Sequence, residues 1–286
     1  MVWELGLVFV SCVPCSVLHK PFASCLFIAG GAAAQPLPFN ATGVTMGHWH
    51  IISNNVDANK KLFLAMGAKM FDVGGNPLMM FPGVYINLNL GQEKGEGGTV
   101  GSVVNHVGFI VNNVQEQVAK WKAAGVPVLP GTNNRPDQAF VVTPDGVRIE
   151  ILEDKTQTVP VKNEHVHLFV PESDISKAQA WYAKTFGGTA GTRNNAAVVD
   201  GIPGVQIRFA KADTAQAPTR HRILDHIGFD VKDHAAFVKK LEADGIKLDE
   251  PPRQATPASN KITYITDPWG TRIEIIERAP LGTPVN

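Results

Sequence analysis

The chain has 286 residues, of which 44% are hydrophobic and 18% are charged, and these proportions exclude a wholly disordered protein. Its 26 basic and 26 acidic residues balance, so no overall charge would attract nucleic acid or an anionic membrane surface. All three cysteines lie within residues 12–25, which removes disulfides and a thiol nucleophile from the rest of the chain. The length predicts two domains, and we expect a small-molecule partner.

Residues 1–43 differ in composition from the rest of the chain. They contain two apolar stretches on either side of Lys20, each too short to span a bilayer. Ala32 and Ala34 fit a signal-peptidase site before Gln35, although Glu4 stands where a basic residue is usual. We interpret this segment as a signal peptide or a disordered leader. A genuine leader would send the protein to the periplasm or outside the cell, without a membrane span in the mature chain, and otherwise the protein is cytoplasmic.

A short sequence motif recurs four times along the chain after residue 43. It consists of a glycine turn, a few strand residues and a polar residue four positions after the glycine. The copies read PGVYIN at 82–87, DGVRIE at 145–150, PGVQIR at 203–208 and WGTRIE at 269–274. Each copy comes after a predicted strand that carries a histidine, at His48, His106, His165 or His226. The chain is therefore predicted to contain four copies of one structural unit.

The second and fourth units show the element order most clearly. Residues 106–111 alternate as a strand, Val114, Val118 and Trp121 follow at helical spacing, and the helix is predicted to stop at Gly125. Proline-rich turns and a strand over 139–142 come next. The fourth unit repeats this order with strands over 226–231 and 262–265. Each unit is thus predicted to fold as βαβββ.

The units are expected to pair in chain order. Units one and two would form a first domain over residues 44–154, and units three and four a second domain over 164–279. A polar linker over 155–163 would join them, and 280–286 would be a tail. The fold class is therefore α+β, with four βαβββ modules paired into two domains.

Histidine and glutamate stand at equivalent positions of the repeats. With neighbouring units paired, the predicted ligand sets are His48, His106 and Glu150 in the first domain, and His165, His226 and Glu274 in the second. Two imidazoles and a carboxylate suit Zn, Ni, Co, Mn or Fe, and open coordination positions suit a catalytic metal. A single strand histidine is more often an ordinary core residue, but coincidence in both halves favours a divalent metal site.

Four further polar residues lie near these sets. His50 and His167 share a strand face with His48 and His165, so we assign them to proton transfer. Asn87 and Arg208 occupy the position that Glu150 and Glu274 occupy in the other units, and we assign them to substrate binding. Arg208 would place a positive charge beside a metal unless a carboxylate or an anionic substrate neutralised it.

The motifs NHVGF at 105–109, TPDGVRIE at 143–150, DHIGF at 225–229 and DPWGTRIE at 267–274 resemble those of the vicinal oxygen chelate superfamily. That superfamily includes glyoxalases, bleomycin resistance proteins and extradiol dioxygenases. The resemblance covers about residues 44–278 and implies a cupped, eight-stranded mixed sheet in each domain. It also implies a metal that chelates two neighbouring oxygens of a substrate.

Differences between this sequence and the family pattern favour some of the family's reactions over others. Asn87 and Arg208 stand where glyoxalase I enzymes carry a glutamate, which disfavours the glutathione-dependent form. The resemblance then implies a glyoxalase-like lyase or isomerase acting on another small oxygenated substrate. One alternative is an extradiol ring-cleaving dioxygenase with iron in the second domain, in which Tyr264 matches the active-site tyrosine. The other is a non-catalytic small-molecule binding protein, and a homodimer is left open.

Overall fold

The computed structural model describes residues 37–73, 75–89, 94–255 and 261–277. Most of the predicted leader and the whole of the predicted tail lie outside these ranges. Within them, no helix has the length and apolar character needed to cross a membrane. The described residues from 37 onward belong to one compact unit.

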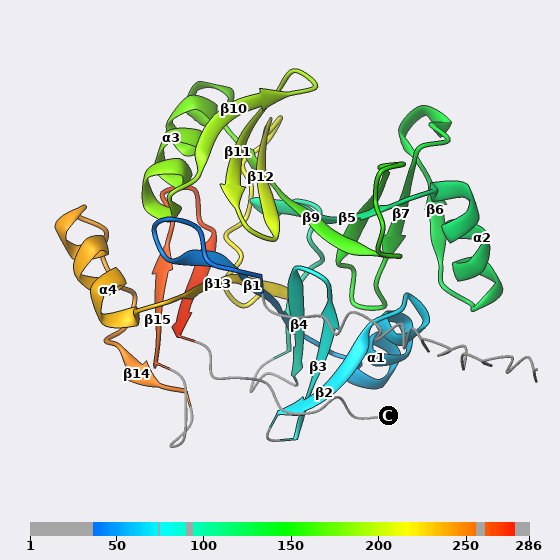
Figure 1. Cartoon of the computed structure of the whole chain (residues 1–286), viewed down its shortest axis with the longest axis horizontal. Coiled ribbons are helices and arrows are strands. Elements are labelled where there is room, and N and C mark those ends of the chain that lie inside the picture. Colours follow the sequence, from blue (N-terminus) through cyan, green and yellow to red (C-terminus); the bar gives the residue numbers. More distant parts are fainter. Residues whose placement is uncertain (1–36, 74, 90–93, 256–260, 278–286) are drawn as a thin grey trace, which may run out of the picture. The chain divides into compact units, whose positions relative to one another are not determined.

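Four βαβββ modules succeed one another along this unit, which confirms the predicted repeat (Figure 1). Module 1 contains β1 (Val44–Ile52), α1 (Val56–Ala65), β2 (Lys69–Val73), β3 (Asn76–Phe81) and β4 (Val84–Asn89). Module 2 contains β5 (Val104–Val111), α2 (Val114–Ala123), β6 (Val128–Pro130), β7 (Gln138–Val142) and β8 (Arg148–Glu153). Module 3 contains β9 (Lys162–Val170), α3 (Ile175–Phe186), β10 (Thr189–Arg193), β11 (Ala196–Ile202) and β12 (Val205–Lys211). Module 4 contains β13 (Leu224–Val231), α4 (His234–Ala243), β14 (Arg253–Gln254), β15 (Lys261–Thr266) and β16 (Arg272–Glu277).

The helices begin and end at residues suited to those positions. Asn55, Asn113 and Asp233 cap the N-termini of α1, α2 and α4, because each side chain accepts a hydrogen bond from a backbone N–H of the first turn. The α3 helix ends at Gly187, which adopts the left-handed conformation that favours glycine. Local chemistry therefore defines the helix within each module.

The modules pair differently from our expectation. The first sheet has the strand order β14-β15-β16-β13-β1-β4-β3-β2, and the second has β10-β11-β12-β9-β5-β8-β7-β6. Module 1 therefore pairs with module 4 through β1 and β13, and module 2 pairs with module 3 through β5 and β9. Each eight-stranded mixed sheet draws on both halves of the chain. The predicted domains over 44–154 and 164–279 do not coincide with the sheets.

An irregularity of register interrupts each of the four central strands next to its first histidine. In both central pairs the register skips one residue on each strand, namely Gly47 on β1, Asp225 on β13, Asn105 on β5 and Glu164 on β9. Such a bulge shifts the alternation of side chains by one position. On β1, for example, Val44 and Met46 are buried in the core before the bulge, and Trp49 and Ile51 after it.

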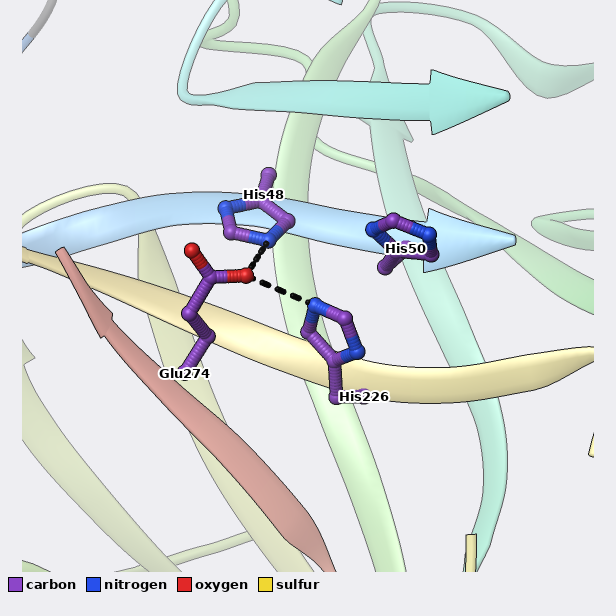
Figure 2. A group of neighbouring side chains, drawn as sticks. All are labelled: His48, His50, His226 and Glu274. Carbon is purple, nitrogen blue, oxygen red and sulfur yellow. Dashed lines mark hydrogen bonds and ion pairs between the residues drawn. The ribbon is translucent and has the colours of Figure 1, made fainter. Parts of the chain in front are cut away.

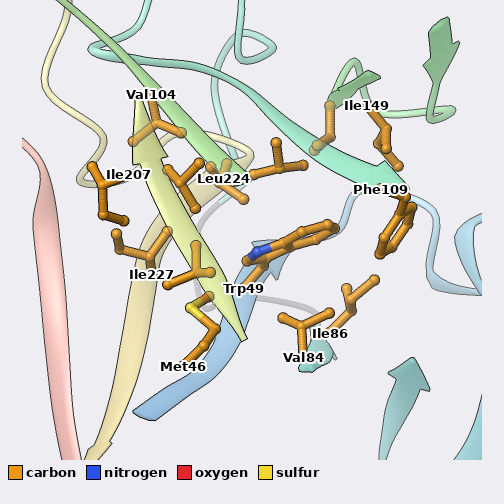
Figure 3. Packing of buried hydrophobic residues seen from close by; sticks show 14 of the residues in the cluster. Met46, Trp49, Val84, Ile86, Val104, Phe109, Ile149, Ile207, Leu224 and Ile227 are labelled. Atoms are coloured by element: carbon orange, nitrogen blue, oxygen red, sulfur yellow. The ribbon is translucent and has the colours of Figure 1, made fainter. Parts of the chain in front are cut away.

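Side chains on the opposite faces of the central strands form one apolar cluster that includes both sheets (Figure 3). Trp49 of β1 is fully buried, and its ring centroid lies 5.2 Å from that of Phe109 of β5. Phe109 also lies 4.6 Å from Phe81 of β3, measured between ring centroids. Burial of such large rings is the main stabilising contribution here, and it links strands of different sheets.

We expect Trp49→Ala to lower the free energy of unfolding by about 3–5 kcal/mol, because it removes the ring that packs between β1 and β5. Denaturant unfolding followed by circular dichroism would measure the change. Val100→Ala is the control, since Val100 is 61% exposed and its loss should change stability by less than about 0.5 kcal/mol. A loss below about 1 kcal/mol in Trp49→Ala would contradict this description of the core.

Candidate functional site

The first sheet gathers four potential metal ligands, which we call the first group (Figure 2). His48 and His50 lie on β1, His226 lies on β13 and Glu274 lies on β16. Each offers one ligand atom, and these atoms all lie within 4.8 Å of one another. Glu274 Oε2 is 3.3 Å from His48 Nε2 and 2.9 Å from His226 Nε2.

The second sheet holds a matching second group. His106 lies on β5, Glu150 on β8, and His165 and His167 on β9, again with ligand atoms within 4.8 Å of one another. Glu150 Oε2 is 3.3 Å from His106 Nε2 and 3.1 Å from His165 Nε2. The two groups therefore repeat the same arrangement of three imidazoles and one carboxylate.

All six residues predicted as metal ligands lie in these groups, but their partners differ from the prediction. His48 lies with His226 and Glu274, rather than with His106 and Glu150. His165 correspondingly lies in the second group. The reason is the sheet order, since modules 1 and 4 share one sheet and modules 2 and 3 share the other.

The residue at each polar bulge hydrogen-bonds to the histidine directly after it. His226 Nδ1 donates to Asp225 Oδ1 at 2.6 Å, and His165 Nδ1 donates to Glu164 Oε2 at 2.5 Å. Because ionised carboxylates only accept hydrogen bonds, Nδ1 of each ring carries a proton. Nε2 then faces the carboxylate of the group. Burial alone would lower the pKa of His226, but contacts with Asp225 and Glu274 outweigh it and raise the pKa. His106 makes the same kind of contact, 2.9 Å from its Nδ1 to Asn105 Oδ1.

Imidazole nitrogens and a carboxylate oxygen therefore converge in each group. In the second group, Oε2 of Glu150 lies between Nε2 of His106 and Nε2 of His165. Such contacts between Nε2 and a carboxylate oxygen are stabilised by a cation, which is either a proton on Nε2 or a metal ion. The donor set fits a divalent transition metal, because imidazole nitrogen and carboxylate oxygen are ordinary ligands of such ions.

A glycine on the neighbouring strand makes room for one histidine in each group. Gly108 on β5 faces His165, and Gly228 on β13 faces His48. A Cβ atom added to either glycine would collide with the imidazole ring of its partner. These two positions therefore favour glycine for lack of space, and not because of an unusual backbone angle.

The charges within the groups shift the pKa values of the carboxylates. Burial alone would raise the pKa of Glu150, but contacts with His106 and His165 outweigh it and hold the pKa well below its usual range. The pKa of Glu274 is likewise lowered, because His48 and His226 outweigh the effect of burial. Both carboxylates are thus ionised at neutral pH and available to bind a cation.

His50 and His167 are neutral imidazoles at physiological pH. Burial, together with His226 and His48, lowers the pKa of His50 to about 3. Burial, together with His106 and His165, lowers the pKa of His167 to about 2. Nε2 of His167 is buried and has no hydrogen-bond partner among the described residues. Both rings can therefore offer a lone pair to a metal ion.

The other predicted site residues lie next to the groups. Tyr264 on β15 donates a hydrogen bond from its hydroxyl to Glu274 Oε2 at 3.1 Å. Burial raises the pKa of Tyr264, so its hydroxyl keeps its proton. Asn87 on β4 is half-buried and is in register with His50. Arg208 on β12 is in register with His167, and two hydrogen bonds of 2.6 and 2.7 Å to Glu164 neutralise its charge.

A cavity of about 460 Å³ opens beside the second group, and His106, Glu150 and His167 are among its lining residues. Its size is within the usual range for small-molecule sites. Phe140 and Phe169 contribute apolar surface, and several arginines contribute charge. The cavity can therefore admit a small molecule next to the potential ligand atoms.

Sequence reasoning missed the residues that orient the histidines, which are Asn105, Glu164 and Asp225. Strict alternation would place each of them on the opposite face from the next residue, the histidine. The sequence nevertheless contained a pattern that indicates the bulges. Buried apolar residues on β5 and β13 are spaced by three positions across the bulge, as in Val104 and Val107 or Leu224 and Ile227. A spacing of three, in place of two, indicates where the alternation of side chains shifts by one position.

Comparison with known proteins agrees with this architecture. The family model described as the Glyoxalase/Bleomycin resistance protein/Dioxygenase superfamily matches residues 165–275, which lie in modules 3 and 4. Glyoxalase I from Zea mays is 16% identical, with a TM-score of 0.60 over 82% of this chain and 92% of that chain. A candidate dioxygenase from Bacillus subtilis is 15% identical, with a TM-score of 0.59 over 85% of this chain and 87% of that chain.

At these identities the two solved structures are informative about the fold alone. No curated protein sequence matches the chain. The family match and the two eight-stranded sheets agree with the resemblance drawn from the sequence motifs. Residues 165–275 therefore match the Glyoxalase/Bleomycin resistance protein/Dioxygenase superfamily model, and the chain shares the α+β fold of these solved structures.

Proposed function

We propose that the protein is a divalent-metal-dependent enzyme that performs glyoxalase-like lyase or isomerase chemistry on a small oxygenated substrate. One observation carries the proposal: in each group, imidazole nitrogens and an ionised carboxylate converge with their ligand atoms within 4.8 Å. The proton on Nδ1 of His165 and of His226 is already committed to a carboxylate. Histidines that bind metals in proteins almost always donate their other ring N–H in this way.

Two ligand sets are proposed, one in each group. His48, His226 and Glu274 would hold an ion in the first sheet. His106, His165 and Glu150 would hold an ion in the second. Zinc, nickel, cobalt, manganese and iron all suit these donors, and the donors do not choose among them. The hydrogen bonds from Nδ1 of His106, His165 and His226 would fix these rings with Nε2 directed at the ion.

The shifted pKa values change the role that we propose for His50 and His167. An effective general base has a pKa near the operating pH, whereas these rings have pKa values of about 3 and about 2. Both rings also lie within ligand distance of the other members of their groups. We therefore propose them as additional metal ligands, and the proton-transfer role suggested by the sequence is disfavoured.

The cavity beside the second group makes that group the proposed reaction centre. A bound divalent ion would polarise two neighbouring oxygens of a substrate and stabilise negative charge that develops on them. Phe140 and Phe169 would cover the apolar part of the substrate, since both line the cavity. The amide of Gln138 contacts Glu150 Oε1 and would hold that carboxylate in position.

A ring-cleaving dioxygenase is the second candidate, and one observation favours it at the first group. Tyr264 donates to Glu274 and its ring centroid lies 5.3 Å from that of His226. The second group has Phe140 at the corresponding register position, opposite Glu150. Only the first group therefore offers a phenol that could donate a proton to a bound catecholate. A binding protein without catalysis is the third candidate.

We expect each of two glycine substitutions to remove the metal from one group only. Gly108→Ala would displace His165 from the second group, and Gly228→Ala would displace His48 from the first. After loading with each divalent metal and desalting, elemental analysis should find two equivalents in the wild type. Each variant should lose about one of the two equivalents, because an ion binds poorly after losing a ligand.

Gly191→Ala is the matched control, since an added Cβ would contact only Val198, at 3.9 Å. Its metal content should equal that of the wild type. Wild-type protein that retains no metal, or variants that retain both equivalents, would contradict the proposed sites.

Activity assays with different substrates and metals would distinguish a lyase or isomerase from a dioxygenase. We expect the protein loaded with zinc, nickel, cobalt or manganese to exchange the hydrogen next to the carbonyl of 2-hydroxy ketones or 2-oxo aldehydes in D₂O, as followed by NMR. Glu150→Gln should slow this exchange by about a hundredfold or more, because the ion would lose its carboxylate ligand.

The competing result would be ring-opened product from catechols with iron-loaded protein under air, lost in Tyr264→Phe. That outcome would replace the lyase or isomerase by the dioxygenase. Failure of both assays with fully metal-loaded protein would leave the non-catalytic binding protein.

A further inference from the structure

The cavity beside the second group has a lining rich in charge. Four arginines and four carboxylates contribute to it, namely Arg135, Arg148, Arg193, Arg208, Asp137, Glu150, Glu153 and Glu164. The charges are equal in number, but they are not all paired with one another. The arginine for which the described residues supply no carboxylate partner is therefore informative about the ligand.

Three of the four arginines pair with carboxylates of the protein. Arg135 lies 2.6 Å from Asp137, measured from Nη2 to Oδ2. Arg193 and Arg208 both bind Glu164, with closest N to O distances of 3.1 and 2.6 Å. These guanidinium groups are positioned by carboxylates and have less charge to offer to a ligand.

Arg148 at the start of β8 differs from these three. Its guanidinium carbon lies 3.9 Å from the centroid of the Phe140 ring, which fixes the group over an aromatic face. Its backbone N–H donates to Thr99 Oγ1 at 3.0 Å. Within the part of the chain that the structure describes, its guanidinium has no hydrogen bond and no carboxylate within 4.0 Å. Arg148 is half-buried and lines the cavity.

The corresponding arginine of module 4 has the acidic partners that Arg148 lacks. Arg272 starts β16, and its guanidinium carbon lies 4.0 Å from the centroid of the Tyr264 ring. It also pairs with Asp225 at 2.8 Å and with Glu250 at 3.4 Å. In module 2 the bulge residue is Asn105 instead of an aspartate, and an amide does not neutralise a guanidinium. The stacked cation is thus present in module 2 without an acidic partner among the described residues.

We propose that Arg148 binds an anionic group of the substrate, so that the second group acts on small oxygenated molecules that carry a carboxylate or a similar anion. The inference rests on the proposed function and names its substrate class. A half-buried cation without a partner is unfavourable, and a divalent ion nearby would add more positive charge. An anionic ligand would balance both charges, and the fork of the guanidinium matches a carboxylate.

A matched pair of probes tests this assignment. The first, 3,4-dihydroxybenzoate, carries two neighbouring oxygens and a carboxylate, and 3,4-dihydroxybenzamide is its neutral counterpart of nearly equal shape. Dissociation constants would be measured by calorimetry for metal-loaded protein and by ligand-observed NMR for metal-free protein. We expect the benzoate to bind more tightly than the benzamide in both states.

Arg148→Gln should weaken binding of the benzoate by about ten- to a hundredfold, because a charged hydrogen bond is lost. Binding of the benzamide should change by less than about twofold. Arg148→Lys, which keeps the charge but not the fork, should give an intermediate loss. Arg135→Gln is the control, since Arg135 lines the same cavity but is paired with Asp137. It should leave the preference for the benzoate unchanged.

Equal losses for both probes in Arg148→Gln, or no loss for either, would overturn the role of Arg148. Wild-type protein without a preference for the benzoate would overturn it as well. Absence of metal binding would instead contradict the proposed function. The comparison of the two probes on metal-free protein would still decide the role of Arg148 in that case.

Discussion

The bulge in each central strand is the constraint on which the candidate sites depend. It shifts the alternation of side chains by one position, so that apolar residues on both sides of it face the core. On β5, β9 and β13, where the bulge residue is polar, it also places that side chain within reach of Nδ1 of the next histidine, as for Asp225 and His226 or Glu164 and His165. On these strands one local irregularity thus preserves the core and turns Nε2 of the imidazole toward the carboxylate of the group.

The two groups share this construction but differ in their surroundings. The first has Tyr264 bound to Glu274, and its stacked Arg272 is neutralised by acidic residues. The second has Phe140 in place of the tyrosine, and its stacked Arg148 has no acidic partner among the described residues. Equal donor sets therefore lie in unequal electrostatic environments, which is expected if the two sheets serve different ligands or different steps.

Much of the architecture was predictable from periodicity and motifs. The α2 helix contains Val114, Val118 and Trp121, whose spacing predicted a helix, and all six proposed metal ligands lie in the two groups. The pairing of modules was not predictable, because four similar apolar patterns do not specify which central strands become neighbours. A cross-strand clue existed in Gly108 and Gly228, since only a residue without Cβ leaves room for the facing histidine. It could be interpreted only once the partner strand was known.

Crystals of the protein soaked with a single divalent metal, with data collected at its absorption edge, would test the account most directly. Anomalous density should place one ion among His48, His226 and Glu274, and one among His106, His165 and Glu150. Both ions would then be bound across the strand pairs that the sheet order creates. Density at neither place, or ions bound by other residues, would contradict the proposal that the bulged strands build metal sites.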